Sequence, residues 1–128
     1  MMSDFDRIGR EDGLTRFTEA FVARCRTDMM IGYLFQRVDP ARLARLEYEH
    51  AAAHLGVGTY TGKPLRAAHA HLTLASAQFD RRLRLLEETG RALGVPDDVV
   101  AGLVAYQASL RSLVLGRDDG RCGAPHGD

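Results

Sequence analysis

Histidine and carboxylate side chains share one face of a segment in the middle of the chain. At spacings of four, three and four residues, this face carries Leu43, Glu47, His50 and His54, which therefore lie in one row if the segment is an α-helix. An imidazole beside a carboxylate can exchange protons with a bound molecule or ligate a metal. The alternative is an ordinary solvated face, but the three alanines at 51–53 leave no better apolar stripe on the opposite side.

Two further histidines lie in the stretch 60–74. Pro64 follows a Thr–Gly turn and suits the first turn of a short helix, because its missing N–H is tolerated there. An apolar side then follows at helical spacing, formed by Leu65, Ala68 and Leu72. His69 lies beside this apolar side, whereas His71 points to a different face. A histidine placed like His69 is either a packed core residue or a metal ligand.

Other metal-binding patterns are weak in this sequence. Zinc and iron–sulfur sites need clustered cysteines, whereas Cys25 lies within an expected helix and Cys122 in a Gly-rich tail. Di-iron bundles repeat Glu-x-x-His on two helices, and only one copy, Glu47 to His50, is present. Histidines on two helices that face one inner space instead favour a single metal or haem site.

The composition excludes several kinds of partner. The 128 residues include 17 Lys and Arg and 17 Asp and Glu, so the formal net charge is zero and no overall field favours nucleic acid or an anionic membrane. No apolar run reaches the length that spans a bilayer, and the first residues lack the pattern of a secretion signal. Because the cysteines show no paired spacing, we expect a soluble, cytoplasmic protein.

Helical periodicity runs through nearly the whole chain. Apolar residues recur every three or four positions, without an alternating strand pattern or an internal repeat. Caps, prolines and glycines bound the expected helices, which cover 4–8, 11–26, 40–55, a short segment after Pro64, 75–93 and 97–115, with a tight helical corner at 31–35. The tail 116–128 lacks apolar residues able to pack, so we expect one domain over 1–115 followed by a flexible tail.

The last two long helices have clear apolar stripes. In 75–93 the expected buried stripe is Phe79, Leu83, Leu86, Gly90 and Leu93. The charged residues of that helix, Arg82 among them, lie mostly off this stripe. In 97–115 the expected buried residues include Val100, Leu103, Val104, Leu110 and Val114, with Gln107 or Ala108 completing the stripe.

A set of spaced residues resembles the truncated haemoglobins, the two-over-two globins, and most of all the first of their three groups. The matches extend from about Asp4 to Leu115 and fall at Phe5–Gly9, Phe21, Asp28, Phe35, Leu55–Gly56, Tyr60–Gly62, Pro64–Leu65, His69, Phe79 and Gly94–Pro96. Arg10 departs from the pattern, since the opening segment of such globins usually carries a second glycine. The resemblance implies an all-α, two-over-two helical sandwich that binds haem b.

The resemblance also implies roles for single residues. His69 takes the place of the proximal ligand of the haem iron, with its other ring nitrogen donating to a neighbouring group, and Phe35 packs on the porphyrin face. His71 belongs to the surface or rim, although a one-turn shift would exchange the two histidines. Further contacts with the cofactor are implied for Val22, Leu43, Glu47, Tyr60, Leu65 and Phe79. Lys63 and Arg66 are candidates for pairing with the haem propionates, the alternative being ordinary surface charge.

The distal side departs from the family pattern. Val22 stands where such globins commonly carry a tyrosine that hydrogen-bonds dioxygen. Glu47, on the distal helix with Leu43, would repel bound dioxygen if ionised but could donate a hydrogen bond if protonated. His50 could pair with Glu47 and form an acid–base pair for peroxide cleavage, or could swing in as a sixth ligand. The alternative is that Glu47 and His50 both face solvent or a haem edge.

The expected function is therefore the binding of small diatomic ligands, namely dioxygen, nitric oxide or carbon monoxide, at a haem held by His69. Because the distal tyrosine is missing, oxygen storage or transport is less expected than redox turnover of a peroxidase-like or nitric-oxide dioxygenase-like kind, with Glu47 and His50 as the catalytic pair. Expected partners are haem, gaseous ligands and a reductase, in a monomer or a homodimer. The competing hypothesis is a globin-fold sensor or interaction protein that does not use haem.

Overall fold

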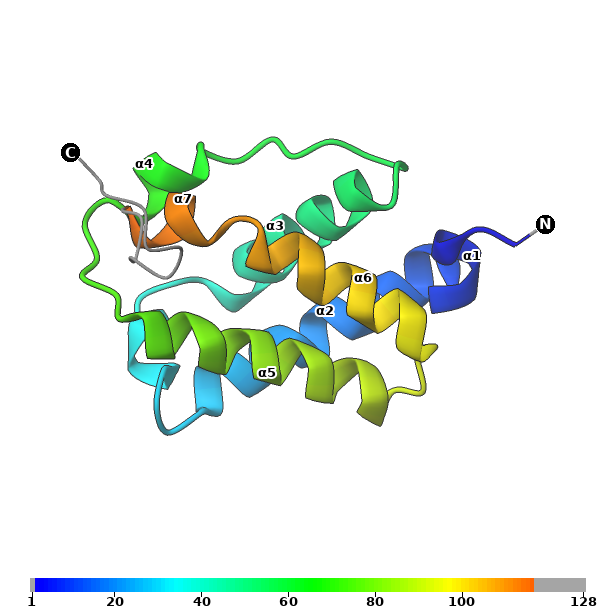
Figure 1. The fold of residues 1–128 in the computed structure, drawn as a ribbon, viewed down its shortest axis with the longest axis horizontal. Coiled ribbons are helices and arrows are strands. Elements are labelled where there is room, and N and C mark those ends of the chain that lie inside the picture. The colour runs from blue at the N-terminus through cyan, green and yellow to red at the C-terminus, as the bar shows by residue number, and fades with distance from the viewer. Residues whose placement is uncertain (1, 117–128) are drawn as a thin grey trace, which may run out of the picture.

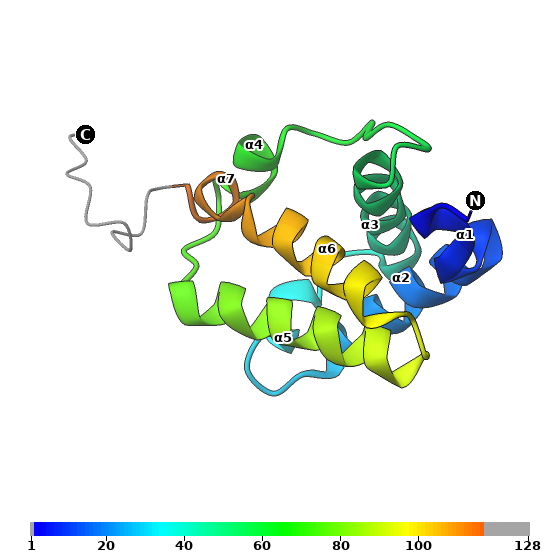
Figure 2. The same cartoon turned by 45° about the vertical axis from the view of Figure 1, so that its right-hand side comes forward.

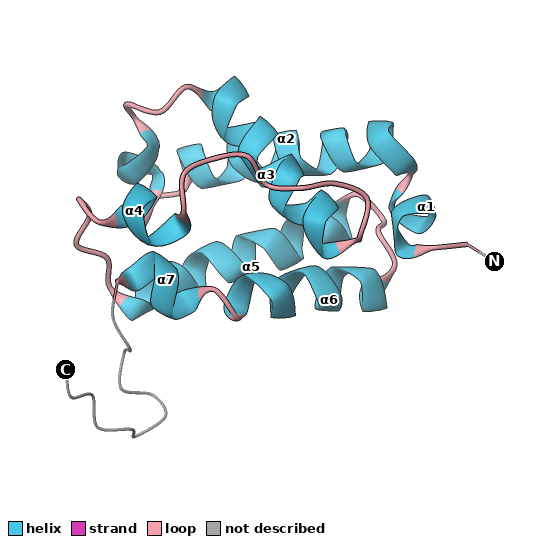
Figure 3. Ribbon diagram, turned by 90° about the horizontal axis from the view of Figure 1, so that it is seen from above, coloured by secondary structure: helices cyan, strands magenta, loops and turns pink. Residues whose placement is uncertain are grey.

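The chain folds into helices that are arranged in two layers. The computed structural model describes residues 2–116. Its elements are α1 (Asp4–Ile8), α2 (Arg10–Thr27), the 3₁₀-helix η1 (Gly32–Phe35), α3 (Pro40–His54), α4 (Leu65–His69), α5 (Ser76–Ala92), α6 (Asp97–Ala108) and α7 (Arg111–Leu115). Helix α2 packs on α3 in one layer and α5 packs on α6 in the other, as Figures 1 and 3 show. This arrangement confirms the predicted two-over-two sandwich.

The helix starts follow from local sequence. Ser3 accepts a hydrogen bond from the N–H of Asp6, and Asp6 accepts one from the N–H of Ser3, which forms a capping box before α1. Gly9 ends α1 with a φ of 107°, a conformation that glycine adopts without a Cβ clash. The next residue, Arg10, also has a positive φ of 58°, which agrees with its place at a position where the truncated haemoglobins that the sequence resembles usually carry glycine. At α3, Asp39 accepts from the N–H of Arg42.

The last predicted helix is broken, contrary to the expectation of one helix over 97–115. The Oγ of Ser109 donates to the carbonyl oxygen of Tyr106 at 2.5 Å, and the N–H of Leu110 donates to the carbonyl of Gln107 at 3.0 Å. Such bonds tighten the chain and compete with the α-helical pattern. As a result α7 turns toward α4 and lies beside it (Figure 2).

The main core lies between the two layers. Its largest fully buried side chains are Leu14, Phe17, Phe21, Ile31, Thr89 and Val99. At Gly90, α5 and α6 approach so closely that an added Cβ would lie 2.5 Å from a methyl carbon of Val100. Cys25 is 2% exposed, and burial raises the pKa of its thiol to about 12, so this thiol is protonated at neutral pH.

Two further sequence expectations concern membrane-spanning helices and the C-terminal tail. In the described residues, no helix combines the length and apolar character needed to cross a membrane. The expected flexible tail falls almost entirely on residues 117–128, which lie outside the described part of the chain.

Candidate functional site

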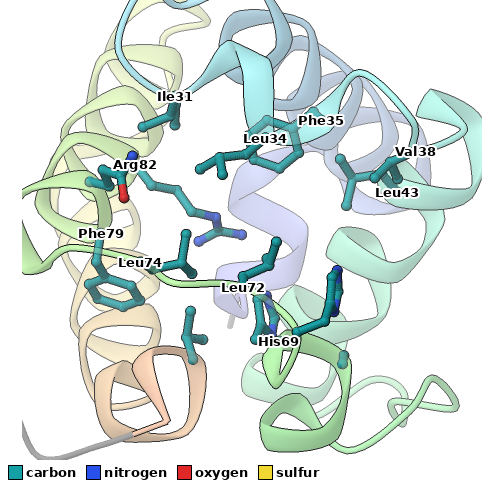
Figure 4. Close-up of a pocket in the computed structure, with 14 residues that line it drawn as sticks. Ile31, Leu34, Phe35, Val38, Leu43, His69, Leu72, Leu74, Phe79 and Arg82 are labelled. Atoms are coloured by element: carbon teal, nitrogen blue, oxygen red, sulfur yellow. The ribbon is translucent and has the colours of Figure 1, made fainter.

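A cavity opens where the corner after α2 meets α4, the start of α5 and α7. It has about 710 Å³ of empty space, a figure that includes space open to solvent. Most of its lining is apolar, from Ile31, Leu34, Phe35, Val38, Leu43, Ala68, Leu72, Leu74, Phe79 and Val114 (Figure 4). The polar lining consists of His69, His71, Gln78 and Arg82. We refer to this space as the first cavity.

A second cavity adjoins the first and extends along α3. It has about 490 Å³ of empty space and shares four lining residues with the first, namely Leu43, Phe79, Arg82 and Val114. Its other lining residues are Leu46, Glu47, His50, Tyr60, Leu65, Gln107 and Leu110. The two cavities therefore form neighbouring parts of one site, which the helices of both layers enclose.

His69 is held in one tautomer by the helix that carries it. Its Nδ1 lies 2.8 Å from the carbonyl oxygen of Leu65, one turn earlier in α4. Because a carbonyl oxygen only accepts hydrogen bonds, Nδ1 carries a proton, which leaves Nε2 as the nitrogen with the lone pair in the neutral tautomer. The half-buried ring lines the first cavity, so an imidazole with a fixed orientation is available there.

His50 faces the second cavity from α3. Its ring stacks on that of Tyr60, with centroids 3.9 Å apart and planes 25° from parallel. The residue is only 8% exposed, yet neither ring nitrogen has a hydrogen-bond partner among the described residues. Buried polar atoms normally find a partner, so His50 is suited to contact a bound group.

The loop before α4 positions Tyr60 over this histidine. The hydroxyl of Tyr60 donates to the carbonyl oxygen of Lys63 at 2.7 Å. The neighbouring Thr61 donates from its N–H and its hydroxyl to Glu49 at 2.7 and 2.9 Å, and these bonds lower the pKa of that carboxyl below its ordinary value. The loop is thereby fastened to α3 on the side where the second cavity lies.

A pH dependence of stability follows from the burial of His50. Burial lowers the pKa of His50, although Glu47 acts in the opposite direction. The unfolded chain therefore takes up a proton near the ordinary value, about 6.5, while the folded protein does not. The free energy of unfolding should fall as the pH drops below about 6.5, and His50→Phe, which keeps the stack on Tyr60, should reduce this loss. Urea unfolding at pH 8, 7, 6 and 5 gives the free energy of unfolding for the haem-free unmodified protein and for His50→Phe. If this free energy depends on pH in the same way in both proteins, the expectation is contradicted.

Glu47 pairs with Arg82 and not with His50, the partner that its spacing allowed. Nη2 of Arg82 binds Oε2 of Glu47, and Nη1 donates to Oε1 of Gln107 at 2.8 Å. The side chains of Arg82 and Glu47 are 19% and 14% exposed. Burial opposes the charge on Arg82, but the adjacent carboxylate more than compensates, so the pKa of this guanidinium lies above its ordinary value. Glu47 is thus an ion-pair acceptor in this structure.

Arg82 is a site residue that the sequence reasoning missed. It was expected to lie off the buried stripe of its helix, but its side chain reaches into the first cavity (Figure 4). Its spacing gives a signal that could have found it, because it follows Phe79 by three residues and precedes Leu86 by four. The positive charge of Arg82 suggested a surface position. Its partner Glu47 is largely buried, however, and the ion pair holds the guanidinium inside the protein.

Not every predicted site residue joins the two cavities. Val22 is buried, but lines a separate depression between α2 and α3. Lys63 and Arg66 are exposed, as is His54, the last member of the row on α3. His71 is exposed and lines the first cavity, which agrees with a place at its rim. Of the remaining predicted residues, Phe35 and His69 line the first cavity, Leu43 and Phe79 line both, and Glu47, His50, Tyr60 and Leu65 line the second.

Comparison with known proteins finds truncated hemoglobins both by sequence and by structure. The chain is 29% identical over 109 residues to the group 1 truncated hemoglobin GlbN of Mycolicibacterium paratuberculosis, which covers 84% of this chain and 80% of that protein. The 2/2 hemoglobin of Synechococcus sp. PCC 7002, solved in the cyanomet state with covalently attached heme, superposes with a TM-score of 0.82 at 23% identity, covering 91% of this chain and 100% of the other.

The Fe(III) form of the truncated hemoglobin from Tetrahymena pyriformis superposes with a TM-score of 0.81 at 22% identity, covering 89% of this chain and 98% of that one. No family model matches the sequence.

Proposed function

Because the chain has the two-over-two fold of the truncated haemoglobins, we propose that it is a haem protein that binds small diatomic ligands such as dioxygen, nitric oxide or carbon monoxide. His69 is the proximal ligand in this proposal. When bound, the haem supplies an iron centre that takes an imidazole on one side and a small ligand on the other.

The observation that carries the proposal is the state of His69. Its Nδ1 donates to the carbonyl of Leu65 at 2.8 Å, which leaves Nε2 as the nitrogen that can ligate a metal on the wall of a largely apolar cavity. A metal-bound histidine usually has its other nitrogen fixed by such a hydrogen bond, because the bond sets the ring orientation and raises the basicity of the ligating atom.

The rest of the site fits a flat, apolar group with acidic substituents. Phe35 and Phe79 offer aromatic surface, and the ring nitrogens of His50, which have no partner in the described part of the chain, offer a polar contact inside the second cavity. Tyr60, Leu43 and Leu65 add further lining to that cavity. The exposed Lys63 and Arg66, near and within α4, are placed in sequence to pair with the propionates of haem b.

Haem titration of the purified protein tests this function. The expected result is stoichiometric uptake with a Soret band, followed by a shift of that band when the reduced protein is exposed to carbon monoxide. A chain that stays colourless after addition of haem would favour the competing hypothesis, a globin-fold sensor or interaction protein without haem.

Redox turnover is a second candidate, and His50 favours it. Within residues 2–116 both nitrogens of this buried ring lack a hydrogen-bond partner, and burial lowers its pKa, which favours the neutral form that can accept a proton. In contrast, the pairing of Glu47 with Arg82 weakens the case for Glu47 as an acid or base. Turnover of the nitric-oxide dioxygenase-like kind would also need a reductase as partner, whereas peroxidase-like turnover takes its electrons from the substrate that is oxidised. Peroxide-dependent oxidation of a dye by the haem-loaded protein, compared with His50→Phe, tests this second candidate.

A further inference from the structure

We propose that Arg82 is the hydrogen-bond donor which this pocket offers to a bound ligand, and that it makes the site favour small monoanions such as azide or nitrite over neutral ligands. The inference rests on the proposed haem function and goes beyond it, since it names a class of ligand and the residue that selects it. It is carried by the position, the anchoring and the surroundings of the guanidinium.

The guanidinium lies at the junction of the two cavities. Arg82 lines both of them, and Figure 4 shows its side chain extending from α5 into the space between Leu34 and Leu72. A ligand that occupies this space will meet N–H groups of Arg82. With Val22 buried away from the cavities, the position that commonly carries a tyrosine in related globins supplies no donor here.

Three contacts hold the guanidinium in place. Glu47 accepts from Nη2, and Gln107 accepts from Nη1 at 2.8 Å. The ring of Phe21 lies under the guanidinium carbon, 4.9 Å from ring centroid to Cζ, which fixes one face. An arginine has five N–H groups, and these two hydrogen bonds use two of them, so the anchored group keeps donors for a ligand.

The surroundings make such a donor selective. The adjoining walls of the cavity are apolar, including Leu34, Leu43 and Phe79, and hydrogen bonds in which one partner is charged are strong where water is scarce. An anionic ligand gains both a hydrogen bond from Arg82 and attraction to its positive charge. A neutral ligand can accept the hydrogen bond but gains little from the charge. The carboxylate of Glu47 partly cancels the attraction, so it sets the strength of the preference.

The test measures the affinity of the ferric, haem-loaded protein for sodium azide and for imidazole, a neutral ligand, by optical titration. Arg82→Met removes the donor. Arg84→Met is the matched control, because Arg84 is exposed on the same helix. Glu47→Gln keeps an acceptor for Arg82 but removes the opposing charge.

Arg82→Met should weaken azide binding about 10- to 100-fold, the effect of losing one hydrogen bond to a charged group, while imidazole binding stays the same or strengthens. Arg84→Met should change neither affinity. Glu47→Gln should strengthen azide binding several-fold, and this arm decides the question if Arg82→Met does not fold.

Azide affinities that are equal in Arg82→Met, Glu47→Gln and the control would overturn the role of Arg82 while leaving the haem function intact. Failure of the unmodified protein to take up haem would instead refute the proposed function, and this inference with it.

Discussion

Replacement of His69 by glycine is expected to remove the axial ligand of the haem, with the largest functional effect of any single change in the chain. Loss of an outer partner of a metal ligand already costs roughly 10–100-fold in affinity, and loss of the ligand itself should cost more. The ferrous spectrum should lose the signature of a histidine-bound iron. Added imidazole, which can enter the space left by the side chain, should restore it.

His71 provides the control for this experiment. It lies two residues further along, lines the first cavity and is exposed, so His71→Ala should leave the spectrum unchanged. The reverse pattern, with the spectrum lost in His71→Ala and kept in His69→Gly, would mean that the proximal ligand has been assigned to the wrong histidine. It would also leave the hydrogen bond from His69 to Leu65 without the role proposed for it.

Replacement of Glu47 by leucine is expected to cause a large loss of stability in the haem-free protein. It leaves the positive charge of Arg82 in a position where the side chain is 19% exposed, and removing one partner of a buried ion pair costs about 3–5 kcal/mol. Because this pair retains some contact with solvent, we expect the lower end, about 3 kcal/mol in the free energy of unfolding.

The double substitution Glu47→Leu with Arg82→Met shows whether the stability lost in Glu47→Leu comes from the broken ion pair or from altered packing. Removing both charges should recover most of the stability, to within about 1 kcal/mol of the unmodified protein, since apolar replacements of a buried pair are often neutral. Urea unfolding of the unmodified protein, the two single variants and the double variant, followed by circular dichroism, gives the coupling energy. It is expected to be at least about 2 kcal/mol, the Glu47→Leu loss minus the double-variant loss, plus whatever Arg82→Met alone costs. A coupling energy near zero would show that the two charges do not stabilise each other.

Much of the fold could be predicted because its helices have local signals at both ends. Capping residues, a first-turn proline and apolar periodicity predicted α1, α2, α3 and α5 close to their observed bounds, and the resemblance to truncated haemoglobins is confirmed. The break after Ala108 was missed because it depends on a side-chain bond, from Ser109 to Tyr106, in a sequence that still favours a helix. Apolar periodicity indicates which face of a helix is buried, but it does not show where a side chain competes for the hydrogen bonds of the helix.

The site was predicted less completely because its chemistry depends on contacts between helices. His69, His50 and Glu47 were found from spacing within single helices, and all three line the cavities. Spacing within α3 suggested that Glu47 pairs with His50, but the partner comes from α5, 35 residues away in sequence. A sequence shows which residues share a face, but not which charges meet across two packed helices.

The close contact at Gly90 has a consequence for the evolution of ligand preference. Gly90 lies in α5 about 12 Å beyond Arg82 along the helix axis, where the absence of a side chain allows Val100 of α6 to approach. A methyl group at this crossing would push the two helices apart and alter the angle at which Arg82 faces Gln107. Ligand selectivity can therefore drift through substitutions that never touch the pocket lining, so comparisons limited to lining residues would overlook them.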